Sequence, residues 1–386
     1  MGTGVVSPEQ QTRHMDRALT LAARGAGAVS PNPMVGAVIV EPDGETILGE
    51  GWHTRYGQAH AEVEAVRDAE RRGHADRLSQ ATMVVTLEPC SHTGKTPPCA
   101  DLIVNRQIPR VIIAHEDPFP EVAGRGIARL RGAGVDVTVG VREHAARRLN
   151  EAFLTHVRTN RPLVTMKWAL TLDGQVATRI GDSRWITSPD ARALVHQWRA
   201  EADAVLIGAG TAEADDPSLT VRDVPLAEGQ TQPLRVALDR TGGLRHSLRL
   251  FTDAHASRTV AVVGSGADPA YGEALTEAGG QVIVVQEEDG HLRLGAVLDA
   301  LGSRHGDVGP VQSLLVEPGP GLATALLRAG LVDRLFAFIA PKLSGAGIGI
   351  AGDLGIHRME GAWTFVEHEW RTVGPDTLLR ACLRRV

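Results

Sequence analysis

The sequence predicts an α/β protein made of two successive layered domains. Short apolar runs, typical of buried strands, alternate along the chain with amphipathic stretches at helical spacing. The length of 386 residues exceeds that of one typical domain and suffices for two with full cores. The turn-forming sequence Thr159-Asn160-Arg161-Pro162 indicates the boundary. We therefore expect one domain over residues 1–158 and a second over residues 159–386.

The first predicted domain begins with a helix. Ser7-Pro8-Glu9-Gln10 combines an N-cap, a proline at the first helical position and a capping-box glutamine, and we expect the helix to reach about Arg24. Apolar residues at helical spacing predict further helices at 61–72, 100–106, 126–131 and 142–158. Apolar runs predict strands at 35–40, 47–51, 83–87, 111–114 and 135–139. This alternation indicates a layered domain with a mixed sheet.

The second predicted domain also alternates strands and helices. Ser188-Pro189-Asp190 caps a helix at 191–200, and other helices are expected between 263 and 281, at 292–301 and at 322–329. Apolar runs predict strands at 163–169, 204–207, 235–238, 258–263, 281–285, 313–317 and 335–339. Two more strand-like runs follow, at 363–367 and 378–384. The pattern is typical of a doubly wound sheet with a β tail.

Charge and cysteine content limit the class of protein. A net charge of −6 gives no electrostatic reason to bind nucleic acid, and no apolar run approaches membrane-spanning length. Three cysteines argue for a reducing compartment rather than a disulfide framework, and Cys382 lies in an apolar stretch typical of a core. The N-terminus lacks the charged-then-apolar pattern of an export signal. We expect a cytoplasmic homo-oligomer that acts on a small molecule, with no nucleic-acid or membrane partner.

Two cysteines and a histidine suggest a metal site. Cys90 follows the predicted strand 83–87, and Cys99 follows Pro97-Pro98, where a helix is expected to begin. Free N–H groups at a helix N-terminus favour a thiolate. His60 opens the predicted helix 61–72 and offers a third ligand. One imidazole and two thiolates balance the charge of Zn²⁺ and leave a position for water, which is the catalytic zinc pattern.

Glu62 lies two residues after His60 and is placed to take a proton from that water. The His-x-Glu…Pro-Cys arrangement is typical of zinc-dependent base deaminases. Taken singly, the two cysteines could be buried core thiols and the histidine an ordinary residue at a helix start. A structural zinc could use His92 as a fourth ligand, but such a site does not need Glu62.

Two glycine-containing segments follow predicted strands of the second domain. They are Ile207-Gly-Ala-Gly-Thr211 and Glu317-Pro-Gly-Pro-Gly321, and the second immediately precedes a helix. Glycines there let the backbone approach a diphosphate, and a helix N-terminus supplies N–H donors to it. Ordinary turns look much the same, so these residues alone leave cofactor binding open. Arg199 and Arg222, taken alone, could equally be solvated surface residues.

The chain resembles the bifunctional deaminase/reductase family of riboflavin biosynthesis over nearly its whole length. In the first half the matching motifs are Pro31-Asn-Pro-x-Val-Gly36, His60-Ala-Glu62 and Pro89-Cys-Ser-His-x-Gly-Lys-Thr-Pro-Pro-Cys99. Eight residues separate the cysteines, as in that family, whereas cytidine and tRNA-adenosine deaminases usually have far fewer. In the second half the matching motifs are Lys167-Trp-Ala-Leu-Thr-Leu-Asp-Gly174, Ser183-Arg-Trp-Ile-Thr187 and Ala214-Asp-Asp-Pro-x-Leu-Thr220.

The resemblance implies a cytidine-deaminase-like three-layer domain followed by a dihydrofolate-reductase-like domain. The first would hydrolyse the 2-amino group of 2,5-diamino-6-ribosylamino-4(3H)-pyrimidinone 5′-phosphate with zinc. The second would reduce the ribosyl chain to ribityl with NADPH. An NADPH preference over NADH is not visible in the residues themselves.

The resemblance also assigns site residues. His60, Cys90 and Cys99 would bind zinc, and Glu62 would be the proton shuttle. The NADPH site would be lined by Ala169, Trp185, Thr211, Asp215, Gly319 and Gly321. The reductase substrate would be held by Ser183, Arg199, Leu219, Arg222 and Glu317. Plausible contacts in the deaminase site are Asn32, His53, His92, Lys95 and Thr96, although Asn32 could be a turn former and His53 an exposed loop histidine.

The sequence departs from the family in two places: Pro318 stands where a glycine is usual, and Phe119 where an asparagine is usual. Three rival hypotheses remain. One is an active deaminase joined to a catalytically inactive reductase-like domain, and another is a deaminase of a different nucleotide or tRNA base. The third is a zinc-stabilised ligand-sensing protein without turnover.

Overall fold

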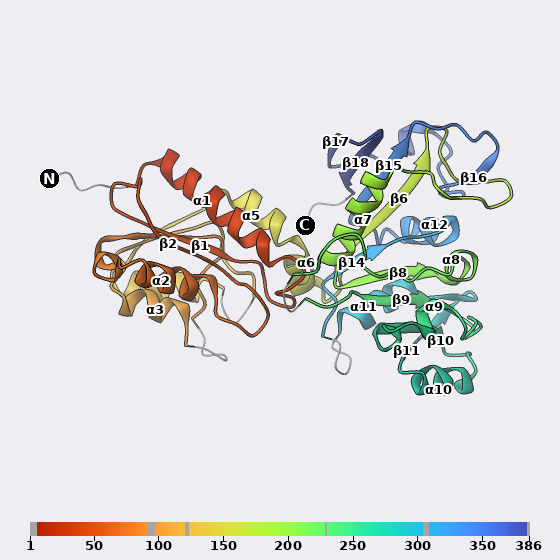
Figure 1. Ribbon diagram of the computed structural model, residues 1–386, viewed down its shortest axis with the longest axis horizontal. Coiled ribbons are helices and arrows are strands. Elements are labelled where there is room, and N and C mark those ends of the chain that lie inside the picture. The colour runs from red at the N-terminus through yellow and green to blue at the C-terminus, as the bar shows by residue number, and fades with distance from the viewer. Residues whose placement is uncertain (1–5, 92–96, 120–122, 228–229, 304–308, 384–386) are drawn as a thin grey trace. The chain divides into compact units, whose positions relative to one another are not determined.

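The computed structural model describes residues 6–91, 97–119, 123–227, 230–303 and 309–383. The chain divides into two compact units, Met1–Arg158 and Thr159–Val386, called unit 1 and unit 2 below. Each unit is built around its own sheet, with helices packed on the sheet (Figure 1).

Unit 1 contains a five-stranded mixed sheet in the order β2-β1-β3-β4-β5. β1 pairs antiparallel with β2 and β3, whereas β3, β4 and β5 run parallel. The strands are β1 (Gly36–Val40), β2 (Ile47–Trp52), β3 (Thr82–Val85), β4 (Arg110–Ile113) and β5 (Asp136–Val139). The helices are α1 (Pro8–Ala22), α2 (Ala61–Arg71), α3 (Cys99–Asn105), α4 (Arg125–Gly132), α5 (Glu143–Leu149) and α6 (Glu151–Thr159).

The alternation of side chains along the strands builds two cores in unit 1. Ala37 and Ile39 of β1 pack with α2, α3 and α4 on one face of the sheet. Val38 and Val40 pack with α1 and α5 on the other. Successive residues of a strand point to opposite faces, so a fully buried strand supports helices on both sides. Unit 1 is therefore a three-layer structure, as expected.

Most of the predicted elements of unit 1 are present, and one is divided. The capping box at α1 is confirmed, because Ser7 Oγ accepts from Gln10 N and Gln10 Oε1 accepts from Ser7 N. The single helix expected at 142–158 is wrong: α5 ends at Leu149 and α6 begins at Glu151. Between them, Asn150 holds the backbone of Met34 from both sides, at 2.8 Å to its N and 2.9 Å to its O. This side-chain pairing anchors the chain where the helix is interrupted.

Unit 2 contains a nine-stranded sheet in the order β11-β10-β9-β8-β14-β6-β15-β18-β17. The first seven strands in this order, from β11 at the edge to β15, run parallel. β18 and β17 add an antiparallel hairpin beside β15. The strands of the sheet are β6 (Leu163–Thr171), β8 (Ala204–Gly208), β9 (Leu234–Leu238), β10 (Thr259–Gly264), β11 (Gln281–Val285), β14 (Ser313–Val316), β15 (Arg334–Ala340), β17 (Glu367–Val373) and β18 (Asp376–Cys382).

Helices cover both faces of this sheet, which confirms the doubly wound arrangement with a β tail. Leu206 of β8 packs with α11 (Leu294–Gly302) and α12 (Pro320–Arg328). Its neighbours Val205 and Ile207 point to the opposite face. That face is covered by α7 (Pro189–Glu201), α8 (Ala209–Asp215), α9 (Arg249–Thr252) and α10 (Pro269–Glu277). Cys382 is buried at 3% exposure, as expected of a core residue.

Unit 2 also differs from the sequence expectation. The strand expected at 363–367 is wrong, because β17 begins only at Glu367, which lies opposite Cys382, the last residue of β18. The segment 207–211 runs directly into α8, which was not expected. Four short strands were also missed: β7 (Gln175–Thr178) pairs with β16 (Gly347–Gly349), and β12 (Glu287–Glu288) pairs with β13 (His291–Leu292).

Short 3-10 helices occupy Ala23–Gly25, Ala75–Gln80, Ala256–Arg258 and Met359–Gly361. Within the described ranges, no helix combines the length and the apolar character needed to cross a membrane.

Candidate active sites

Three candidate metal ligands converge in unit 1. His60 Nδ1 lies 3.6 Å from Cys90 Sγ and 3.4 Å from Cys99 Sγ. The three ligand atoms all lie within 4.8 Å of one another. One imidazole and two thiols at this spacing fit a tetrahedral zinc ion with one position left for water. The residues present therefore suit zinc.

Local structure explains how residues far apart in sequence meet here. His60 is the N-cap of α2, in extended conformation, and Cys99 is the first residue of α3, behind the N-cap Pro98. Cys90 follows β3, and its sulfur accepts a hydrogen bond from Cys99 N at 3.3 Å. Hydrogen bonds from Cys99 and His60 lower the pKa of the Cys90 thiol, which favours the thiolate that binds a metal.

Glu62 is buried beside this cluster. It lies in the first turn of α2, two residues beyond His60, and only 3% of its surface is exposed. Burial, and then the neighbouring Cys90 thiolate, raise the pKa of Glu62 to about 7. A carboxyl group in such a place can exchange a proton with a bound water or substrate.

Glu88 is a residue that the sequence reasoning missed. Its carboxylate, on a side chain 4% exposed, accepts four backbone hydrogen bonds. The donors are Asp117 N at 3.1 Å, Gly124 N at 3.0 Å, Gly126 N at 2.8 Å and Ile127 N at 3.1 Å. The α4 N-terminus is thereby tied to the segment that leads into Cys90. An acidic residue directly after a buried strand, in Leu-Glu-Pro-Cys, was the available signal.

The predicted deaminase contacts Asn32 and His53 form a pair. Asn32 Nδ2 lies 3.1 Å from His53 Nε2, and His53 Nδ1 lies 3.0 Å from Ala59 O. His53 is 2% exposed, so it is not an exposed loop histidine, and burial lowers its pKa. The neutral ring thus donates through Nδ1 and accepts through Nε2. The other three predicted contacts, His92, Lys95 and Thr96, lie outside the described residues.

Unit 2 contains a cavity of about 790 Å³. It lies beyond the carboxyl ends of β8 and β14, where open α/β sheets bind ligands. All eleven residues expected from the sequence to form the reductase site line it: Ala169, Ser183, Trp185, Arg199, Thr211, Asp215, Leu219, Arg222, Glu317, Gly319 and Gly321. They come from segments between β6 and α12, so only the fold brings them together.

A buried charge cluster lies on the cavity wall. Arg199 Nε donates to Glu317 Oε1 at 2.7 Å, and Lys167 Nζ lies 3.5 Å from Glu317 Oε2. Burial raises the pKa of Glu317, but the charges of Arg199 and Lys167 outweigh it and hold the pKa at about 2. Lys167 opens one of the family motifs, but no feature of the sequence around it assigns it to the site.

The β14–α12 turn offers backbone to the cavity. Gly319 is the N-cap of α12 and Pro320 its first residue. Gly321 lines the cavity, and a Cβ built on it would meet nothing within 4 Å. Pro318 also lines the cavity but has no N–H to donate. Arg192 and Trp185 also line the cavity, and the guanidinium of Arg192 lies 4.5 Å from the ring centre of Trp185.

Known proteins identify the family. The riboflavin biosynthesis protein RibD of Aquifex aeolicus (strain VF5) is 40% identical over 371 residues, which cover 96% of this chain and 98% of that protein. The chain belongs to the RibD family. Residues 162–379 match the RibD C-terminal domain, and residues 8–115 match the cytidine and deoxycytidylate deaminase zinc-binding region. The resemblance and the fold class expected from the sequence are confirmed.

Solved structures agree with the RibD assignment. Acinetobacter baumannii RibD, form 1, has a TM-score of 0.84 and 34% identity, and the match covers 97% of this chain and 99% of that one. A diaminohydroxyphosphoribosylaminopyrimidine deaminase/5-amino-6-(5-phosphoribosylamino)uracil reductase from Thermotoga maritima has a TM-score of 0.79 with 34% identity, covering 97% and 99%. As a RibD family member, the chain is a bifunctional deaminase and reductase that uses zinc and NADPH.

Proposed function

We propose that the two activities of this RibD family member are divided between its units, deamination in residues 1–158 and reduction in residues 159–386. The substrate of the first step is 2,5-diamino-6-ribosylamino-4(3H)-pyrimidinone 5′-phosphate. The second step reduces the ribosyl chain of the deaminated product to ribityl. The observation that carries the proposal is the convergence of His60, Cys90 and Cys99 beside the buried carboxyl of Glu62. A purely structural zinc site would not need that carboxyl.

In unit 1, His60, Cys90 and Cys99 would hold the zinc ion, which when bound supplies the Lewis acidity that activates water near neutral pH. Glu62 takes a proton from the attacking water at its carboxylate and delivers it to the amino group that leaves as ammonia. The burial of Glu62 keeps bulk water from competing for that proton.

Asn32 and His53 would contact the pyrimidine ring or its ribose. Their mutual hydrogen bond uses one of the two Asn32 Nδ2 hydrogens, so the amide oxygen would accept from the substrate and the second hydrogen would be donated to it. His53, anchored to Ala59 O, fixes the orientation of that amide. His92, Lys95 and Thr96 complete the proposed set.

In unit 2, the cavity would hold NADPH, which when bound supplies the hydride. Six lining residues would bind it, namely Ala169, Trp185, Thr211, Asp215, Gly319 and Gly321. The substrate would be held by Ser183, Arg199, Leu219, Arg222 and Glu317. Arginine suits the phosphate because its forked donors match phosphate oxygens. Lys167 and Arg199 keep Glu317 ionised on the cavity wall.

We further propose a cytoplasmic homo-oligomer. Several apolar side chains of unit 2 are unusually exposed, among them Ile180 at 89%, Met359 at 85% and Leu343 at 75%. The edge strand β17 adds Trp370 at 53% exposure. Exposed apolar patches and unpaired strand edges favour association with another chain. The cytoplasmic location is supported by Cys90 and Cys99, whose thiols must stay reduced to bind metal.

Product mass after incubation of the zinc-loaded protein with the diaminopyrimidinone phosphate and NADPH tests the proposal. Exchange of one amino group for a carbonyl oxygen together with addition of two hydrogens is the expected result. Deamination without hydrogen addition would mean that the reductase-like unit is inactive, and Pro318 would be the first residue to replace. No change in mass would refute the assigned substrate.

A further inference from the structure

The segment Asp216–Arg222, called the cavity segment below, follows α8 and forms part of the wall of the unit 2 cavity. It contributes Leu219 and Arg222, which the proposed function assigns to the substrate. Within the described ranges, backbone groups from Pro217 to Arg222 make no hydrogen bond to other backbone groups. An irregular segment at a binding site needs other partners to hold one conformation.

Side chains supply those partners. Ser218 O accepts from Arg235 Nη1 at 3.0 Å, and Thr220 O accepts from Arg199 Nη1 at 3.2 Å. Val221 is held on both sides by one amide, since Gln232 Oε1 accepts from Val221 N at 2.7 Å and Gln232 Nε2 donates to Val221 O at 3.0 Å. The Gln232 side chain thus makes the two backbone hydrogen bonds that a neighbouring strand would make in a sheet.

Arg235 is the unusual member of this set. It lies on β9, an interior strand of the parallel part of the sheet, and its side chain is 0% exposed. Besides Ser218 O, its guanidinium donates to Asp253 Oδ2 at 2.7 Å and to Leu250 O at 2.9 Å. Burying an arginine is costly even when it is paired, and a hydrophobic residue in its place is often no less stable. Stability alone therefore does not explain an arginine here.

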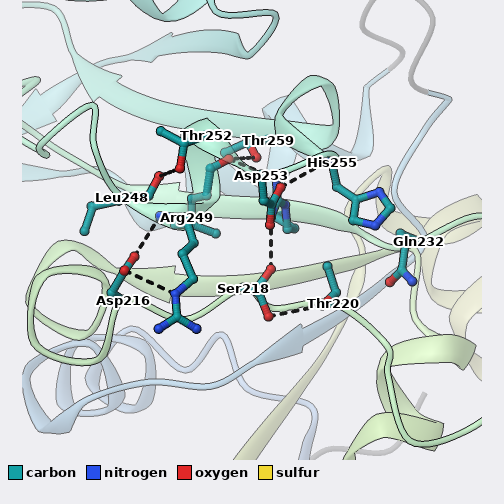
Figure 2. A network of polar contacts seen from close by, with 12 residues as sticks. Asp216, Ser218, Thr220, Gln232, Leu248, Arg249, Thr252, Asp253, His255 and Thr259 are labelled. Atoms are coloured by element: carbon teal, nitrogen blue, oxygen red, sulfur yellow. Dashed lines mark hydrogen bonds and ion pairs between the residues drawn. The ribbon is translucent and has the colours of Figure 1, made fainter.

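Figure 2 shows how the network joins the cavity segment to the region of α9. Asp216 lies beside Arg249, Ser218 beside Thr220, and Asp253 beside His255. The Asp216 carboxylate accepts from Arg249 N at 2.7 Å, and Asp253 Oδ1 accepts from His255 N at 2.9 Å. The segment is thus held by Arg235, which does not line the cavity, and by Arg249, which does.

The held conformation is one that the chain would not adopt freely. Leu219 has φ of 51°, in the left-handed region, and its side chain is 2% exposed. A non-glycine residue there needs support from its surroundings. On either side of it, Ser218 O and Thr220 O are the atoms that Arg235 and Arg199 hold. Arg199 in turn pairs with Glu317, so the segment connects to the charge cluster.

We propose that Arg235 and Gln232 are positioning residues of the reductase site, which hold the cavity segment so that Leu219, Arg222 and Arg199 meet the phosphate-bearing substrate. Neither residue lines the cavity, so they act through the segment and not by touching substrate. The inference rests on the proposed function of unit 2.

The test uses the full-length, zinc-loaded protein and NADPH oxidation with the deaminated pyrimidine. Gln232→Ala removes both hydrogen bonds to Val221. Arg235→Lys keeps the positive charge but loses the planar guanidinium, whose several N–H groups bind Ser218, Asp253 and Leu250 together. We expect each to raise KM for the pyrimidine about five- to tenfold, the range for lost ordinary hydrogen bonds. The KM for NADPH and the deaminase rate should change less than twofold. Hydrogen exchange at Val221 should also accelerate in Gln232→Ala.

Matched controls separate positioning from general destabilisation. Gln197→Ala removes a glutamine of the same unit whose amide bonds Glu201 on the same helix. Arg161→Lys alters an arginine that also holds a backbone carbonyl and a buried carboxylate, that of Asp333. Both should leave KM for the pyrimidine unchanged. If Arg235→Lys does not fold, the KM of Gln232→Ala for the pyrimidine alone decides whether the positioning role holds.

Unchanged KM in folded Gln232→Ala would overturn the positioning role. The positioning role would also be overturned if Arg235→Lys and Arg161→Lys showed the same fall in kcat with no change in KM. Such a result would reflect a smaller amount of folded protein. Absence of NADPH oxidation by the unaltered protein would instead refute the proposed function, and this inference with it.

Discussion

Replacing Glu88 by glutamine would test how the segment that leads into Cys90 is held. The carboxylate accepts from four backbone N–H groups, two at each oxygen. An amide keeps one acceptor oxygen and replaces the other with an NH2 group. Because all four partners are donors, either orientation of the amide leaves two N–H groups facing another donor.

The structure sets the expected magnitude. A buried donor without an acceptor costs about 1–3 kcal/mol, so two of them should lower the stability of unit 1 by about 2–6 kcal/mol. This is a large part of the about 5–15 kcal/mol that stabilises a typical domain. The Pro89-Cys90 turn packs on Gly126, where an added Cβ would lie 2.0 Å from Pro89 O. Loosening α4 should therefore also weaken zinc affinity, by about 10–100-fold if Glu88 acts like other outer partners of metal sites.

The assay combines hydrogen exchange of the peptide that contains Gly126 and Ile127 with zinc competition against a chelator. Both protection and zinc affinity should fall in Glu88→Gln. The matched control is Glu143→Gln, which changes an acid in the first turn of α5 that pairs with Arg147 on the surface. That change should cost less than about 0.5 kcal/mol. Normal protection of α4 together with normal zinc affinity in Glu88→Gln would refute the reasoning.

Three further predictions concern the two sites. Glu62→Gln should keep zinc and fold but lose deamination by about 10²–10⁴-fold, as measured by ammonia release, while NADPH oxidation with the deaminated substrate persists; full deamination would end the proton-shuttle assignment. Gly321→Val should fold normally, because an added Cβ there meets no atom within 4 Å, yet raise KM for NADPH about tenfold or more by filling the space toward the cofactor; an unchanged KM would show that NADPH does not approach α12. Arg199 and Lys167 hold the pKa of Glu317 at about 2, against an ordinary value of 4.5. Its ionised form therefore stabilises the folded unit by about 3 kcal/mol above pH 4.5. This contribution is lost as the pH falls from 4.5 toward 2. Denaturant unfolding of Glu317→Gln should therefore lack part of the acid-dependent loss seen in the unaltered protein, and identical pH slopes would contradict this pairing.

Local signals were enough for much of this protein. The capping box at Ser7 and Gln10 fixes the start of α1, and the apolar runs fix most strands, because these features depend on residues a few positions apart. The candidate zinc ligands could be proposed from the sequence alone, because few residue types bind zinc and their motif spacing is distinctive, and the structure brings the three side chains together. The interruption of the helix at Asn150 cannot be predicted from the local sequence, because it coincides with hydrogen bonds from the Asn150 side chain to Met34, which is distant in sequence.

The tertiary structure decided what depends on long-range contacts. Nothing in the local sequence shows that Glu88 caps α4, that Lys167 reaches Glu317 or that β17 starts only where β18 can pair with it. A buried charge such as Arg235 reads in sequence as an ordinary surface arginine, and only its partners on other segments reveal its place. Residue types and spacing determine which chemistry is available, whereas the fold determines which groups meet, because hydrogen bonds and ion pairs depend on distances that sequence separation does not encode.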